Sequence, residues 1–231
     1  MSFSRLLLCG AFFAGISGGA AQAGYVAFNN LSNGGAGNDA VANVSNGGAG
    51  PLAQSFSTTS AGSITGLKLF LGGGGIDADS IVITLHNDLS HSPGSVLGSS
   101  LTVSDSLIPA GAGGVYTLDN LQLANLFAPL TASTRYWIEI HDLYAGNNPL
   151  LATNVTWSLA QDASGTGVSG QFTMDAGTVG SNSGAIFPAV NRAPLLMEVD
   201  VPEPMTLAVL GVGIAGLGWV RNRRQKSASK L

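Results

Sequence analysis

The chain has 231 residues, of which 45% are hydrophobic, only 10% are charged and 33 are glycine. This hydrophobic content is enough to form a core, and the single cysteine excludes a disulfide framework or a cysteine-based metal cluster. The formal charge of −4 hides an uneven distribution, because residues 24–200 hold twelve acidic and three basic residues. Such an acidic body excludes nucleic-acid binding, which needs clustered Lys and Arg.

The N-terminus has the three parts of a secretory signal peptide. Arg5 supplies the positive charge, residues 6–16 form the apolar stretch, and Ala21-Gln22-Ala23 is a small-x-small cleavage site before Gly24. An uncleaved membrane helix is the alternative, but three interrupting glycines and the lack of a stop-transfer flank favour cleavage. We therefore predict that residues 1–23 direct export through the Sec machinery and are removed, together with Cys9.

The body, residues 24–200, has the pattern of an all-β domain. Around residue 138, apolar and polar residues alternate with the period of a strand, so that Tyr136 and Trp137 point to opposite faces. Glycine, asparagine, serine and proline clusters separate such segments, and no long amphipathic helix lies between them. We predict an antiparallel, jelly-roll-like β-sandwich with one helical turn within 121–127. The predicted strands are 53–59, 67–71, 81–86, 96–103, 115–119, 135–141, 155–160, 170–175 and 195–199.

A hexapeptide, Ser-Asn-Gly-Gly-Ala-Gly, occurs at 32–37 and again at 45–50. A repeated unit can present an ordered array, but two copies are too few for a solenoid. We expect two similar flexible loops near the mature N-terminus.

Several short segments of the body resemble the bacterial choice-of-anchor domains, most closely type R. The matching segments are Ala-Gln-Ser-Phe at 53–56, Ser-Pro-Gly-Ser-Val-Leu at 92–97 and Leu-Thr-Ala-Ser-Thr-Arg-Tyr-Trp at 130–137. They occur in the family's order over about residues 25–200. The resemblance implies surface display and carries no activity.

Two G-x-G-x-x-G matches, at 165–170 and 211–216, lack the setting of a dinucleotide site. Such a site needs a strand before the glycines, an amphipathic helix after them and an acidic residue about 20 positions further on. The first match leads into a predicted strand, and the second lies inside an apolar run. We interpret both as coincidences in a glycine-rich chain.

Three histidines are the candidate catalytic or zinc-binding residues: His86, His91 and His141. A zinc site or a Ser-His-Asp triad can be drawn with Asp88 or Asp142. Neither H-E-x-x-H nor G-x-S-x-G is present, so no local motif supports such a site. We predict solvated surface histidines, no catalytic residue, no cofactor and no enzyme; a secreted hydrolase is an alternative.

Two other features keep a binding role open. Asp77 and Asp79 follow four glycines and are a weak calcium candidate, although the full loop pattern is missing. Aromatic residues in the second half of the body are candidates for a sugar-stacking platform, but such residues more often pack in the core of a sandwich. An adhesion module that binds carbohydrate or calcium is therefore an alternative function. The aromatic residues are Tyr136, Trp137, Tyr144 and Trp157.

A second apolar run, Met205–Val220, contains no charged residue. As a helix it would be about 24 Å long, slightly short of the hydrocarbon core of a bilayer, and its aliphatic residues favour insertion by roughly 2–4 kcal/mol. Trp219 and a basic cluster follow the pattern of a cytoplasmic helix end, which places the acidic body outside. We predict one transmembrane helix over 205–220 and a basic tail over 221–231. The basic cluster is Arg221, Arg223, Arg224 and Lys226.

The tetrapeptide Val201-Pro202-Glu203-Pro204 stands directly before this apolar run. Two prolines fix an extended backbone, so we expect an exposed, extended segment that suits recognition or cleavage by a membrane enzyme. The order of this motif, a glycine-rich apolar helix and an arginine cluster closely resembles the PEP-CTERM sorting signal. Residues 225–231 extend beyond the point where many relatives stop.

The resemblance to PEP-CTERM signals implies a destination. It implies a Gram-negative bacterium whose exosortase, a polytopic membrane enzyme, recognises and processes the tail. The protein would first be anchored in the inner membrane and then reach the cell surface, extracellular polysaccharide or biofilm matrix. We therefore predict a surface-sorted structural or interaction protein with the boundaries 1–23, 24–200 and 201–231.

Overall fold

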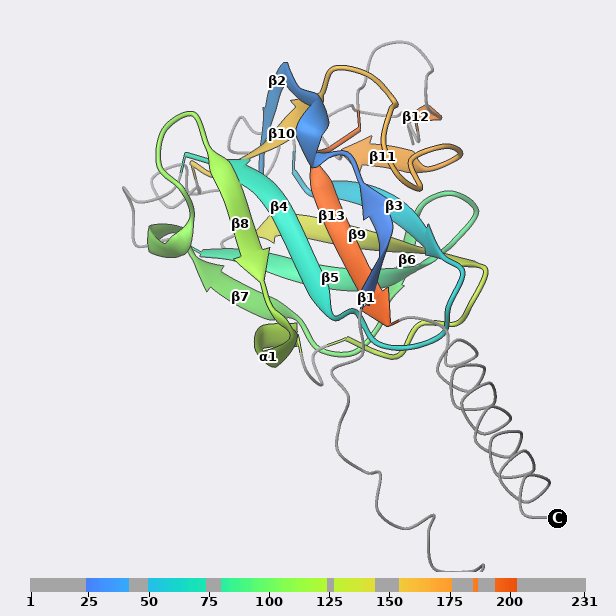
Figure 1. The fold of residues 1–231 in the computed structure, drawn as a ribbon. Helices are drawn as coiled ribbons and strands as arrows, with labels where there is room; N and C mark the ends of the chain where they lie inside the picture. Colours follow the sequence, from blue (N-terminus) through green and yellow to red (C-terminus); the bar gives the residue numbers. More distant parts are fainter. Residues whose placement is uncertain are drawn as a thin grey trace, which may run out of the picture.

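The structure, a computed structural model, describes residues 24–41, 50–73, 80–123, 127–143, 154–175, 185–186 and 194–202. In this part of the chain the protein consists of two antiparallel sheets in two layers (Figure 1). The prediction of an all-β sandwich is therefore confirmed. The predicted signal peptide and the helix over 205–220 lie outside the described residues.

The first sheet has the order β1-β13-β4-β10-β2, and β8 pairs with β4 as well. Its strands are β1 (Gly24–Asn29), β2 (Gly34–Ala40), β4 (Gly66–Gly72), β8 (Gly114–Leu118), β10 (Thr156–Ala160) and β13 (Met197–Pro202). The first and last strands of the described body are thus neighbours.

The second sheet has the order β12-β11-β3-β9-β5-β6, and β7 also pairs with β5. Its strands are β3 (Leu52–Thr58), β5 (Ser80–Asp88), β6 (Pro93–Val96), β7 (Leu101–Ser104), β9 (Thr134–Asp142), β11 (Phe172–Asp175) and β12 (Ala185–Ile186). One α-helical turn, α1 (Asn120–Leu123), overlaps the range 121–127 predicted for it and begins one residue earlier.

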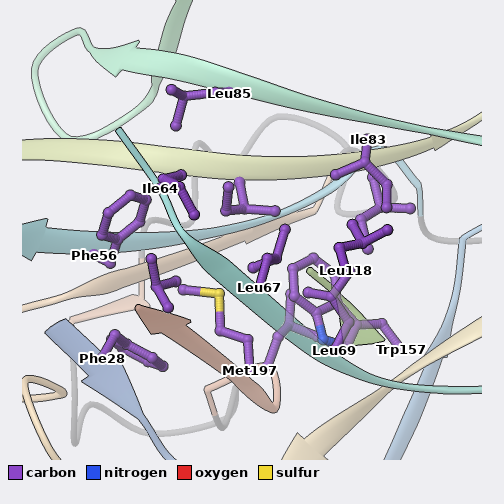
Figure 2. Close-up of a cluster of buried hydrophobic side chains, with 14 of the residues drawn as sticks. Phe28, Phe56, Ile64, Leu67, Leu69, Ile83, Leu85, Leu118, Trp157 and Met197 are labelled. Atoms are coloured by element: carbon purple, nitrogen blue, oxygen red, sulfur yellow. The ribbon is translucent and has the colours of Figure 1, made fainter. Parts of the chain in front are cut away.

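The main core lies between the sheets and follows the predicted alternation. The fully buried leucines at 67, 69 and 71 on β4 face Ile81, Ile83 and Leu85 on β5. Figure 2 shows Leu67, Leu69, Ile83 and Leu85 together with Phe28, Phe56 and Met197, which come from β1, β3 and β13. Each such side chain contributes about 1.5–3 kcal/mol on burial.

The outer face of the second sheet is covered as well, which the alternation did not predict. Val82, Thr84 and His86 on β5 are all buried, although they point away from the main core. A second cluster lies on this face, in which Trp137 packs with Ala53, Phe172 and Met174. The strand β5 is therefore buried on both faces.

Two local predictions are wrong. The predicted strand 96–103 is divided into β6 and β7, because Gly98 between them has a φ of +84°, which interrupts a strand. The first copy of the hexapeptide repeat, predicted as a loop, forms a 3₁₀ turn and the start of β2. Its backbone pairs with β10, and Asn33 donates to Ser164, so backbone pairing holds a segment that has no apolar pattern.

The glycines of the first G-x-G-x-x-G match have a structural role. Residues 165–167 lie against β1, where Asn29 and Thr166 exchange backbone hydrogen bonds. A Cβ at Gly165 or Gly167 would lie within 2.3 or 2.1 Å of a β1 carbonyl oxygen. Glycine therefore permits the close approach of this loop to the first strand.

Candidate sorting site

The two ends of the described chain meet at one edge of the first sheet. Gly24, predicted as the first residue after signal cleavage, is the register partner of Pro202, and Tyr25 is the partner of Val201. Figure 1 shows β1 and β13 side by side at this edge. We call Gly24–Tyr25 and Val201–Pro202 the paired ends.

The first half of the predicted sorting tetrapeptide belongs to this folded sheet. Val201 is fully buried in the main core, and Pro202 is half-buried as the last residue of β13. A side chain at Gly62 would meet the Pro202 ring at 3.0 Å, so this loop packs against the proline. The segment is extended as predicted, but the expected exposure is wrong for Val201, because β13 continues the core alternation to that residue.

The hydroxyl group of Tyr25 connects the paired ends to the loop after β3. It lies 2.7 Å from Thr58 Oγ1 and accepts hydrogen bonds from the backbone N–H groups of Thr59 and Ser60 at 2.7 and 3.3 Å. Burial alone would raise the pKa of the Tyr25 phenol, but these hydrogen bonds outweigh it and the pKa is lowered from its ordinary value. The first strand is thereby tied to both layers of the sandwich.

Charged side chains on the outer face of the first sheet lie beside the paired ends. Lys68 on β4 forms an ion pair with Glu198 on β13, and Asn29 on β1 donates a hydrogen bond to the same carboxylate. Asp200 lies on this face too. Its pKa is raised by burial and by the negative charge of Glu198, against the smaller effect of Lys68.

Two of the three predicted histidines, His86 and His141, lie near the same carboxylate, Glu139 on β9, and the His86 Nε2 is 3.6 Å from it. His86 is buried, contrary to the expectation of a solvated residue, and its ring is hydrogen-bonded at 2.9 Å to both Thr84 Oγ1 and the Gly94 carbonyl of the neighbouring strand β6. His141 Nδ1 lies 3.4 Å from Glu139. His91 is exposed as predicted and stacks on Phe172 at a centroid distance of 4.4 Å. Within the described residues no group of three His, Cys, Asp or Glu side chains has the arrangement of a metal site.

The aromatic residues of the proposed sugar platform that the structure describes are packing residues. Tyr136 and Trp137 point to opposite faces as predicted, but each is buried, with 4% and 0% exposure. Trp157 is fully buried too, and its Nε1 donates to the Leu196 carbonyl at 2.9 Å. These three side chains offer no face to a sugar ring.

Several predicted sites lie outside the described residues. No membrane-spanning helix is found in the described ranges, and the predicted anchor helix lies beyond them. The predicted sites outside these ranges are the signal cleavage residues Ala21 and Ala23, the calcium candidates Asp77 and Asp79, Tyr144, the motif residues Glu203 and Pro204, and the basic residues Arg221, Arg223, Arg224 and Lys226.

The pairing of β1 with β13 was not predicted from the sequence. The available signal was the short run Tyr25–Phe28, an apolar segment between glycine and asparagine that has the length of a buried strand. Sequence spacing alone does not show that such a strand pairs with one about 170 positions later.

Together these features define a class of protein: an all-β domain whose last strand leads directly into a C-terminal sorting segment. Residues 200–224 match the PEP-CTERM protein-sorting motif. The match begins at Asp200, so its first three residues belong to β13. No curated protein and no solved structure matches this chain.

Proposed function

We propose that this protein is exported and sorted by exosortase through its C-terminal segment, and that its β-sandwich then acts as a non-enzymatic component of the cell surface or extracellular matrix. The single observation that carries the sorting role is the PEP-CTERM match at residues 200–224. A Gram-negative host and contact with matrix polysaccharide follow from the same resemblance.

The geometry of the paired ends supports this proposal. An exported chain with a signal peptide and a C-terminal anchor is connected to one membrane at both ends during export. Since Gly24 and Pro202 are register partners, both connections leave the same edge of the sandwich. The sandwich can therefore fold completely while both ends remain attached to the membrane.

Deletion of residues 203–231 tests the sorting role without removing any residue of β13. We expect the truncated chain to be exported, to fold and to be lost from the cell surface into the periplasm or the medium. Surface labelling and fractionation measure this loss. A truncated protein that remains at the surface at the wild-type level would contradict the proposal.

Point variants give a finer test of the same role. Glu203→Ala with Pro204→Ala alters the tetrapeptide, and we expect the unprocessed chain to accumulate in the inner membrane. Lys230→Ala lies beyond the matched residues and is the control. Equal processing of both variants would exclude a role for the tetrapeptide.

The non-enzymatic role of the body is a separate part of the proposal. It is supported by the position of His86, which is buried and hydrogen-bonded at both ring nitrogens. We expect the purified wild-type protein and its His141→Ala variant to hydrolyse test substrates no faster than buffer alone. A turnover that this substitution abolishes would overturn the non-enzymatic assignment.

A further inference from the structure

The last strand of the body has neighbours on both sides. Residues 197–200 of β13 pair with β4, and residues 198–202 pair with β1. At the C-terminal end, Thr65 donates its N–H to the Asp200 carbonyl at 2.9 Å. Withdrawal of β13 would therefore break two hydrogen-bond ladders.

The side chains at the end of β13 hold it in place. Val199 and Val201 both have 0% exposure, and each contributes about 1.5–3 kcal/mol on burial. Pro202 has no N–H to continue the ladder, and it packs against the loop at Gly62. The first proline of the sorting tetrapeptide is therefore also the residue that ends the strand.

A strand in this position is a poor substrate. Enzymes and domains that recognise a peptide in an extended form need its backbone groups and alternate side chains to be free. The backbone up to Asp200 is paired on both sides, and the Val201 side chain lies in the core. The first peptide bond beyond this ordered strand joins Pro202 to Glu203.

We infer that Val201 and Pro202 remain in the mature protein, because the bond that the sorting enzyme breaks lies on the C-terminal side of Pro202. The inference rests on the proposed exosortase function and adds the position of the cut. In the reaction a peptide C–N bond breaks and the carbonyl carbon bonds to the oxygen of a water molecule. A proton of that water goes to the amine of the departing tail. The sandwich stays folded throughout this step.

To determine the position of the cleaved bond, the full chain is co-expressed with exosortase. The processed protein is then analysed by intact mass and C-terminal peptide sequencing. We expect a C-terminus at Pro202 or later. A C-terminus at Val201 or earlier would overturn the inference and leave the sorting function intact. A chain that keeps Leu231, beside a control substrate that the same enzyme processes, would overturn the sorting function and the inference together.

A cross-strand disulfide tests whether β13 must leave its neighbours. Val26 and Asp200 are register partners on β1 and β13, and partner Cα atoms in antiparallel strands lie about 4.5–5.5 Å apart, within the range of disulfides. In the oxidising periplasm, Val26→Cys with Asp200→Cys would lock the paired ends. We expect the locked chain to be processed at the rate of the single variant Asp200→Cys, within about twofold.

The single variant controls for any direct contact of the enzyme with Asp200, and a thermal melt establishes that both variants fold. Processing of the single variant together with a block of the oxidised double variant would show that β13 must detach, and it would overturn the inference. Equal processing of the two variants, with the disulfide intact in the product, supports it.

Discussion

Lys68 and Glu198 lie directly opposite each other on β4 and β13 and form an ion pair on the outer face of the first sheet. The Glu198 side chain is only 11% exposed, whereas Lys68 is 37% exposed. Lys68→Met would leave Glu198 and Asp200 without this neighbouring cation. We expect the free energy of unfolding to fall by about 1–2 kcal/mol, measured by urea denaturation. Lys68→Arg keeps the charge and should lose less than half as much.

The pH dependence of this effect follows from the same hydrogen bond. Glu198 raises the pKa of Lys68 above its ordinary value of 10.5, so the folded protein holds this proton more tightly than the unfolded chain. The stabilisation is fully present below 10.5 and is lost as the pH rises through the folded-state pKa. The difference between wild type and Lys68→Met should therefore be constant from neutral pH to about pH 9 and shrink in more alkaline buffer. A difference that shrinks already below pH 9 would contradict this assignment.

Asp200 differs from Lys68 because its charged form destabilises the fold, although stability falls with rising pH in both cases. Its pKa in the folded state is raised from the ordinary 3.8, so the folded protein binds the proton more strongly and loses stability as the pH rises from 3.8 through the folded-state pKa. Asp200→Asn removes this titration. We expect the melting temperature of Asp200→Asn, relative to wild type, to be higher at pH 7 than at pH 3.

Asp162 is a matched control for Asp200. Hydrogen bonds from Asn33 and Ser164 lower the pKa of its carboxyl group, so it stabilises the fold above pH 3.8 and loses this effect as the pH falls. Asp162→Asn should therefore lower the melting temperature at pH 7 and have little effect at pH 2. The same direction of pH dependence for both variants would contradict these two assignments.

The sequence was sufficient to predict the elements that bury side chains in a regular pattern. The alternation around Leu69, Ile83 and Ile138 gave β4, β5 and β9 within two residues at each end. The pattern did not predict β1 and β2. Glycines dominate β2, whose backbone pairing with β10 determines its structure. Sequence periodicity reports side-chain burial and contains little information about backbone partners.

The candidate site shows the same limit. The tail motif could be predicted from the sequence, because its prolines, apolar run and basic cluster are local features. The match at residues 200–224 confirms this prediction. The burial of Val201 depends on contacts with strands more than 100 residues away in the sequence. Likewise, the covering of Trp137 and His86 required the placement of β11 and β6. Long-range pairing therefore determined the burial of Val201.

Gln54 is a buried polar residue that connects the segment before β13 to the second sheet. Its Nε2 donates to the Phe172 carbonyl at 3.1 Å, and its Oε1 accepts from the Leu195 N–H at 3.0 Å. Gln54→Leu would leave both backbone groups without this partner in the core. We expect a loss of about 2–4 kcal/mol in the free energy of unfolding. Gln122→Leu, at an exposed glutamine whose Oε1 accepts from the Asp119 N–H at 3.1 Å, should cost less than about 1 kcal/mol in the same measurement. Equal losses would show that burial does not determine the cost.

Alanine substitutions at Gly167 and Gly170 distinguish the cost of a steric contact from the cost of backbone strain. Gly167 and Gly170 have similar positive φ values, +68° and +77°. A Cβ at Gly167 would lie 2.1 Å from the Ala27 carbonyl oxygen on β1, whereas a Cβ at Gly170 would meet nothing within 4 Å. Gly170→Ala therefore adds only the strain of a left-handed alanine, about 1 kcal/mol. Gly167→Ala also pushes the loop away from β1, and we expect it to cost at least about 3 kcal/mol. Thermal and urea unfolding of the two variants measure the difference, and equal costs would mean that this loop does not depend on its contact with the first strand.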